Sequence, residues 1–124
     1  MRQPDIEIYL KDADQQAVSS WLSRVIGPTT DWQQRGQTFK CQAADIPVTW
    51  VPKAVGRWSS LLLESENTPW ADDLSCAKDA FAALGCQIRC AVGGWQEDEA
   101  ADADADLWLK VDAEGVSQIT WRTE

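Results

Sequence analysis

Six carboxylates crowd into the ten residues "EDEAADADAD", and no other stretch of the chain has residue types and spacing so suggestive of chemistry. They are Glu97, Asp98, Glu99, Asp102, Asp104 and Asp106. Closely spaced carboxylates can bind calcium, attract a basic partner, or simply keep a connecting loop solvated. These three roles require different neighbouring residues, so the sequence can be tested against each.

The calcium-loop pattern is not met. An EF-hand loop needs glycine at its sixth position and glutamate at its twelfth. A loop starting at Asp102 would have Leu107 and Ala113 at these positions, and one starting at Asp98 fails at Ala100. The run therefore predicts no metal site, and we expect no cofactor.

Docking of a basic protein partner is the functional reading that remains for the run. Residues 97–124 carry nine acids and two bases, whereas residues 1–96 carry eleven acids and nine bases. A local acidic surface steers basic partners and disfavours nucleic acid and anionic membranes. Tryptophan is enriched at interface hot spots, and one lies at each end of the run. The predicted partner-binding set is Trp95, Glu97, Asp98, Glu99, Asp102, Asp104, Asp106 and Trp108. A merely solvated loop, with the tryptophans covering a sheet face, stays open as the alternative.

Residues for catalysis are scarce, so the sequence favours a binding role over an enzymatic one. The chain has no histidine, which removes the commonest general base and the usual Ser-His and Cys-His couples. Glu64 and Glu66 form the one acid pair outside the run that is worth inspecting. No catalytic residue is predicted.

A second functional reading places a small anion or small molecule at the start of a helix, in a binding or enzymatic role. Thr68 followed by Pro69 is typical of a helix N-terminus, where free N–H groups can hold an anion. Asn67, Thr68 and Trp70 would line that cleft. A third reading is a homodimer formed through a free strand edge of the C-terminal hairpin.

Hydrophobic periodicity gives the elements that would position these residues. Alternation predicts strands at 5–10, 38–43, 46–52, 57–65 and 86–92, and a hairpin at 107–122. Helical spacing predicts one helix within 11–28 and another from Thr68 to about Gly85. Residues 28–37 read as a polar loop. Cys76 falls off the apolar face of the second helix, so we expect it to be the most accessible thiol.

This order predicts an α+β fold with two helices on one face of an antiparallel sheet. It resembles a ferredoxin-like βαββαβ topology with an extra C-terminal β-hairpin. The segments "NTPWADDLSCAKDAFAALG" and "DLWLKVDAEG" also resemble small bacterial proteins of unknown function. That resemblance implies a fold and carries no catalytic residues.

Length and composition predict a single domain spanning residues 1–124, with an acidic loop at 96–106. Eight tryptophans suit a core in which most of them are buried or half-buried. The start of the chain has no apolar segment of signal-peptide length, and no run is long enough to span a membrane. We therefore expect a cytoplasmic protein whose four cysteines are free thiols.

Overall fold

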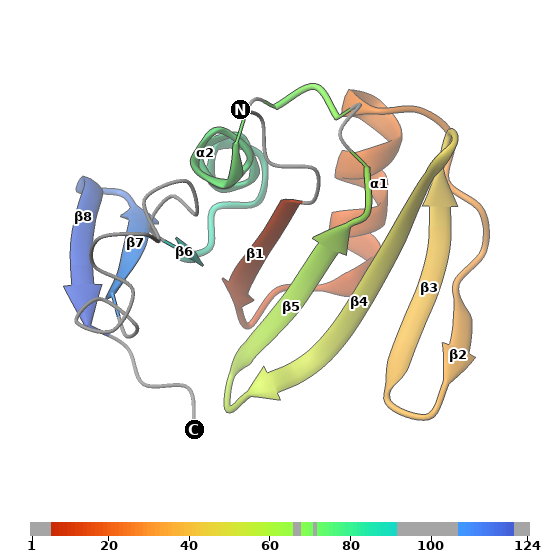
Figure 1. Cartoon of the computed structure of the whole chain (residues 1–124), viewed down its shortest axis with the longest axis horizontal. Helices are drawn as coiled ribbons and strands as arrows, with labels where there is room; N and C mark the ends of the chain where they lie inside the picture. The colour runs from red at the N-terminus through yellow and green to blue at the C-terminus, as the bar shows by residue number, and fades with distance from the viewer. Residues whose placement is uncertain (1–5, 66–67, 71, 92–106, 121–124) are drawn as a thin grey trace, which may run out of the picture.

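The computed structural model describes residues 6–65, 68–70, 72–91 and 107–120. Two helices and eight strands follow one another in these residues, and Figure 1 shows their arrangement. In chain order they are β1 (Ile6–Lys11), α1 (Gln15–Val25), β2 (Gln33–Arg35), β3 (Thr38–Ala43), β4 (Ile46–Val55), β5 (Trp58–Leu63), α2 (Asp73–Leu84), β6 (Ile88–Ala91), β7 (Leu107–Asp112) and β8 (Gly115–Thr120).

All eight strands form one antiparallel sheet in the order β2-β3-β4-β5-β1-β6-β7-β8. The first strand of the chain is thus an inner strand, paired with β5 on one side and β6 on the other. The α+β prediction with an antiparallel sheet is confirmed. The sheet is larger than a simple βαββαβ unit, because β2 and β3 extend one side and β7 and β8 extend the other.

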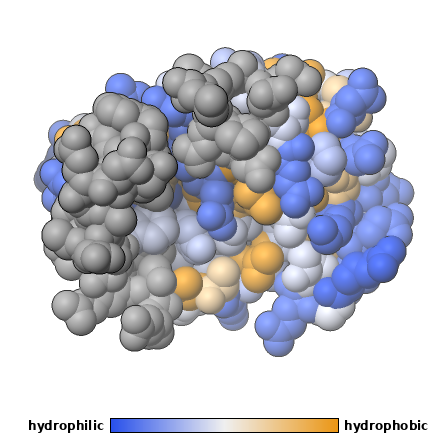
Figure 2. All heavy atoms as spheres, in the orientation of Figure 1, coloured by the Kyte–Doolittle hydropathy of each residue, from blue (hydrophilic) through white to orange (hydrophobic). Residues whose placement is uncertain are grey.

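The two faces of the sheet differ in what they bury. One face, here the helix face, carries alternate apolar side chains that pack against both helices in one core, including Ile8, Leu61 and Ile88. The opposite face, here the open face, carries the intervening residues, such as Glu7 and Tyr9 on β1. Because α1 lies behind the sheet in Figure 1, the open face of β3–β5 is toward the viewer. In Figure 2 hydrophilic atoms dominate the right-hand part of this view, over β2–β4.

Helix α1 forms as its sequence predicts. Asp14 is the N-cap, and its carboxylate accepts a hydrogen bond of 3.0 Å from the Ala17 backbone N–H. Val18, Trp21 and Leu22 form the buried face. The helix ends before Gly27, whose φ of +156° lies in a region that side-chain-bearing residues rarely adopt. Gly27 is also close to Ala44, so a side chain at this position would have no room.

Helix α2 begins later than predicted, at Asp73, and Asp72 is its N-cap. The Asp72 carboxylate accepts a hydrogen bond of 2.8 Å from the Ser75 backbone N–H. Gly85 ends the helix in the left-handed conformation, at φ +75°. The predicted start at Thr68–Pro69 is therefore wrong, because a threonine and a proline suit a turn before a helix as well as its first turn.

The buried face of α2 also differs from the prediction. Its most buried residues are Asp73, Cys76, Ala77 and Ala80, whereas Leu74, Phe81 and Leu84 are only half-buried. The small side chains point at the sheet and allow the helix to approach it closely, while the large ones fill the margins. Cys76 is completely buried, so the expectation that it is the most accessible thiol is wrong.

The polar segment 28–37 was expected to be a loop, but residues 33–35 form the short strand β2. All three of its residues are exposed, and it is a strand because it pairs with β3.

Strand β4 contains Pro47 and Pro52, although it is an inner strand of the sheet. The register of β4 against β5 shifts between Val51 and Val55, so Pro52 lies where the regular pairing of these strands is interrupted. Among the described residues, no helix combines the length and apolar character needed to cross a membrane.

Candidate functional site

The acidic run and Trp95 lie outside the described residues, so their predicted role stays a prediction. The described strands on either side nevertheless fix where the connection begins and ends. Ala91, the last residue of β6, is the register partner of Trp108 in β7. Neighbouring strands lie about 5 Å apart. The two residues that flank segment 92–106 are therefore neighbours in the sheet, and this segment carries all six carboxylates.

Trp108 lies on the open face, as the alternation of β7 predicts. Its ring packs edge-on against Tyr9, with the ring centroids 5.4 Å apart and the planes at 85°. Val111 lies on the opposite, helix face and is buried, at 3% exposure. Trp108 itself is half-buried. This packing agrees with the alternative that Trp108 covers a sheet face within the monomer, and it leaves part of the ring exposed.

Arg89 and Trp58 continue this group of side chains. The Arg89 guanidinium carbon lies 4.3 Å from the centroid of a Trp58 ring, which is a cation–π distance. Arg89 is the register partner of Tyr9, so Trp58, Arg89, Tyr9 and Trp108 cross β5, β1, β6 and β7 on one face. We call these four residues the open-face cluster. It lies beside the strand ends to which the acidic segment is tethered.

Burial shifts the pKa of two members of the open-face cluster, Tyr9 and Arg89. Burial raises the pKa of Tyr9, and the negative charge of Glu7 raises it further. The Ser60 hydroxyl donates a hydrogen bond of 3.2 Å to Glu7 and so orients this carboxylate. Burial also lowers the pKa of Arg89. Tyr9 therefore keeps its proton at neutral pH, and the cluster is a packing and hydrogen-bonding surface rather than a source of a phenolate base.

Thr68 and Trp70, predicted to line a cleft at a helix start, are instead buried in the turn before α2. The Thr68 hydroxyl donates a hydrogen bond of 3.1 Å to the Trp70 carbonyl, and Trp70 is 5% exposed. The Trp70 indole N–H donates to the Asp79 carboxylate at 2.9 Å, and its ring packs 5.4 Å from that of Trp21. Asn67 lies outside the described residues. The first turn of α2 is capped by Asp72, so its N–H groups are not arranged around Thr68.

Asp73, at the first turn of α2, was not singled out from the sequence. It is 8% exposed, and its Oδ1 has no hydrogen-bond partner. Burial raises its pKa from 3.8 to about 6, and the nearby charges of Glu7 and Asp72 act in the same direction. Its buried neighbours Cys76 and Cys90 are thiols whose pKa is also raised by burial, that of Cys90 to about 12. These thiols are protonated at neutral pH and are poor nucleophiles.

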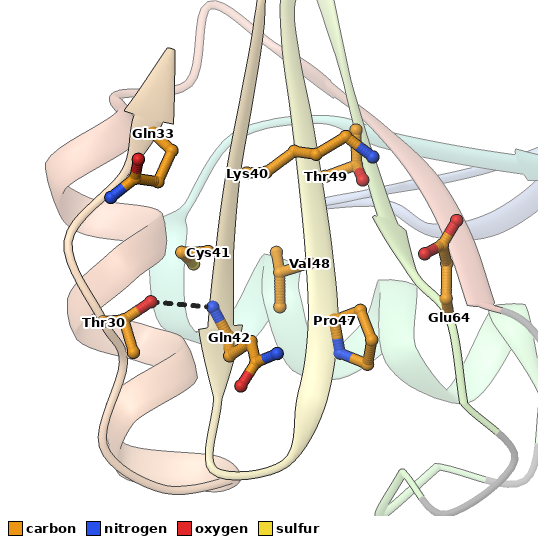
Figure 3. A pocket seen from close by; sticks show the side chains of 9 residues that line it. All are labelled: Thr30, Gln33, Lys40, Cys41, Gln42, Pro47, Val48, Thr49 and Glu64. Carbon is orange, nitrogen blue, oxygen red and sulfur yellow. Dashed lines mark hydrogen bonds between the residues drawn. The ribbon is translucent and has the colours of Figure 1, made fainter. Parts of the chain in front are cut away.

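A shallow hollow of about 340 Å³ lies on the open face over β3–β5, beside the segment that leads into β2. Figure 3 shows the Lys40 side chain crossing β4 toward Thr49, with the Glu64 carboxylate beyond it. The Thr30 hydroxyl accepts a hydrogen bond of 3.0 Å from the Gln42 backbone N–H at the other side. Strand alternation alone predicts that Lys40, Gln42 and Thr49 share a face, but only the sheet order brings Glu64 next to them.

Within the described part of the chain, no three cysteine or acidic side chains gather where they could hold a metal ion. Comparison with protein-family models, with curated proteins and with solved structures finds no match to this chain.

Proposed function

We propose that this protein is a non-enzymatic binding protein that engages a basic protein partner, in the manner of an inhibitor, immunity or adaptor protein. The contact would be made by Trp95, Trp108 and the carboxylates of residues 97–106. The observation that carries the proposal is the pairing of Ala91 with Trp108, the two residues that flank the segment bearing the six carboxylates, next to the open-face cluster. Charge concentrated at one point of a surface accelerates encounter with an oppositely charged partner.

The chemistry of the described residues supports a binding role. The chain has no histidine, and three of its four thiols are buried. Burial raises the pKa of all four thiols, that of Cys41 to about 11, so the thiolate form is disfavoured at neutral pH. A binding function needs none of these groups to be reactive.

The experiment is a capture from cell lysate followed by a titration with the purified partner. The bait is the wild type beside the triple variant Asp102→Asn, Asp104→Asn, Asp106→Asn. The matched control is Asp31→Asn, Asp45→Asn, Glu64→Gln, which makes the same change of three charges on exposed residues in the β2–β5 half. We expect the triple variant to bind at least about tenfold more weakly at low salt, since each rim charge contributes roughly 0.5 kcal/mol. The control should bind like the wild type.

Increasing salt should weaken the wild-type complex and reduce the difference between the two baits. A partner that binds the wild type and the triple variant equally well, with no effect of salt, would show that the acidic run is only a solvated connection. The docking proposal would then be wrong.

The alternative function is the binding of a small anion or small molecule, which was expected at Thr68–Trp70. That location required a helix to start at Thr68, whereas α2 starts at Asp73. The hollow over β3–β5 gives this function a different location. There Lys40 and Glu64 present opposite charges without forming an ion pair with each other in the described structure. A ligand of this hollow would be affected by the control variant, through Glu64, and not by the triple variant, so the same two proteins distinguish the alternatives.

We also infer that β1, α1, β4, β5, α2 and β6 form a ferredoxin-like unit. The order β4-β5-β1-β6, with one helix following β1 and the other following β5, supports this inference. Strands β2–β3 and β7–β8 are then additions to its two edges. A cytoplasmic location is proposed as well. It is supported by four cysteines that are free thiols, since oxidising compartments favour disulfides.

A further inference from the structure

The two edges of the sheet differ in how well they are protected against pairing with another strand. At one edge β2 is only three residues long, and it carries Arg35. At the other edge β8 has six residues with the sequence GVSQIT, which contains no charge and no proline. Its register with β7 is regular from Leu107↔Thr120 to Asp112↔Gly115. Short length, charge, proline and bulges are the devices that blunt an edge, and β8 has none of them.

The turn between β7 and β8 determines which β8 residues have a free backbone. Asp112 and Gly115 are register partners across two turn residues, so they form the closing hydrogen-bonded pair of the hairpin. Because antiparallel pairs alternate, Val116 and Gln118 direct their backbone N–H and C=O groups away from β7. Among the described residues, β8 is the last strand of the sheet, and no strand pairs with its outer side.

Val116 adds an exposed apolar side chain to this edge. It is 44% exposed, the one large hydrophobic residue so exposed in the described part of the chain. It lies on the helix face as the register partner of Val111, which is buried. The apolar surface of the helix face therefore continues onto β8, the last strand of the described sheet.

We propose that β8 pairs with β8 of a second copy of this chain, antiparallel and across a two-fold axis perpendicular to the sheet. Such pairing would join the outward N–H and C=O groups of Val116 and Gln118 from both copies. It would also keep the helix faces of the two copies on the same side, so that both Val116 side chains lose exposure. Because β8 carries no charge, two copies of it can pair without repulsion between like charges. A basic peptide, by contrast, would find no carboxylate on this strand.

Salt separates this proposal from the proposed function. Each copy carries a formal net charge of −9, so the two copies repel each other. Screening by salt should therefore strengthen the dimer, while it weakens a complex with a basic partner. The two proposals can thus fail independently.

The experiment is sedimentation equilibrium of the full chain over a range of concentrations, at low and at high salt. The test variant is Gln118→Pro, which removes one outward N–H and keeps the hydrogen bonds of β8 to β7. The matched control is Gln34→Pro on β2. Turn residues 36–37 connect β2 to β3, and the register partners Arg35 and Thr38 close this hairpin. Because antiparallel pairs alternate, the backbone N–H of Gln34 points away from β3, at the other edge of the sheet.

We expect the wild type and Gln34→Pro to form dimers that tighten with salt. Gln118→Pro should dissociate about tenfold or more readily, since the two-fold axis removes the hydrogen bond twice. Circular dichroism checks that each variant is folded. If Gln118→Pro does not fold, Val116→Glu replaces it, because it brings two carboxylates together across the axis and should weaken the dimer similarly. A monomeric wild type at every salt concentration, or a dimer unaffected by folded edge variants, overturns the proposal.

Discussion

Asp73 shows how a single buried group can link protonation to stability. Its carboxylate is buried at the first turn of α2 with an unpartnered Oδ1, and burial raises its pKa from 3.8 to about 6. A carboxyl group with a raised pKa in the folded state binds protons there before it does so in the unfolded chain. This group therefore contributes stability that increases as the pH falls from above 6 toward 4, and costs stability above pH 6.

We expect Asp73→Asn to increase the free energy of unfolding by about 1–2 kcal/mol at pH 8, because it removes a buried charge. The loss of a negative charge near the helix N-terminus reduces this gain slightly. At pH 4.5 the folded carboxyl is mostly protonated while that of the unfolded chain is still mostly ionised, so the gain should be clearly smaller than at pH 8, and it disappears only below about pH 3.8. Urea unfolding at the two pH values measures the difference, with the exposed Asp45→Asn as control. A gain that is the same at both pH values would contradict this assignment.

Some of the site residues could be predicted from the sequence, and others could not. The face of Trp108 followed from its alternation with Leu109 and Val111. The hydrogen bond from the Trp70 indole to Asp79, by contrast, depends on how a turn folds back over a helix. The open-face cluster joins residues from four strands, so it becomes visible only when the sheet order is known. Trp21 is a further surprise, since its buried indole N–H has no partner in the described structure.

Among the elements, those with a strong local pattern were predicted correctly. Strand β1 alternates buried and less buried residues, and α1 has its cap and its apolar face at the expected spacing. Strand β2 was missed because its residues are all polar and exposed, and pairing with β3 alone makes them a strand. The start of α2 was misplaced because two capping patterns occur within five residues. Only packing selects between them.

Substitution of Asp72 tests which residue caps α2. Asp72→Ala should lower the free energy of unfolding by about 1 kcal/mol, because the Ser75 N–H loses its acceptor. Asp72→Asn should restore most of that loss, since asparagine is an equally good N-cap. Thermal or urea unfolding provides the measurement. If alanine is harmless at position 72, the helix start described here is incorrect.

For the molecule as a whole, the excess of negative charge opposes compactness. Raising sodium chloride from about 20 to 300 mM shortens the Debye length from roughly 20 Å to about 6 Å and screens this repulsion. We therefore expect the free energy of unfolding to rise by roughly 1 kcal/mol over this range. The triple variant at residues 102, 104 and 106 should show a smaller rise, as measured by urea unfolding in each buffer. A fall in stability with salt would indicate that favourable ion pairs outweigh the repulsion.

The position of β1 in the sheet sets the order in which the chain can fold as it is made. Ile6–Lys11 leave the ribosome before the strands they pair with, which are Trp58–Leu63 and, later still, Ile88 and Arg89. Strands β3, β4 and β5 pair with their neighbours in sequence and can form as they emerge. The inner strand β1, with its apolar Ile6, Ile8 and Leu10, stays unpaired until β5 has been made. A nascent chain therefore exposes this hydrophobic strand until β5 and β6 have been made, which makes it a natural binding segment for chaperones.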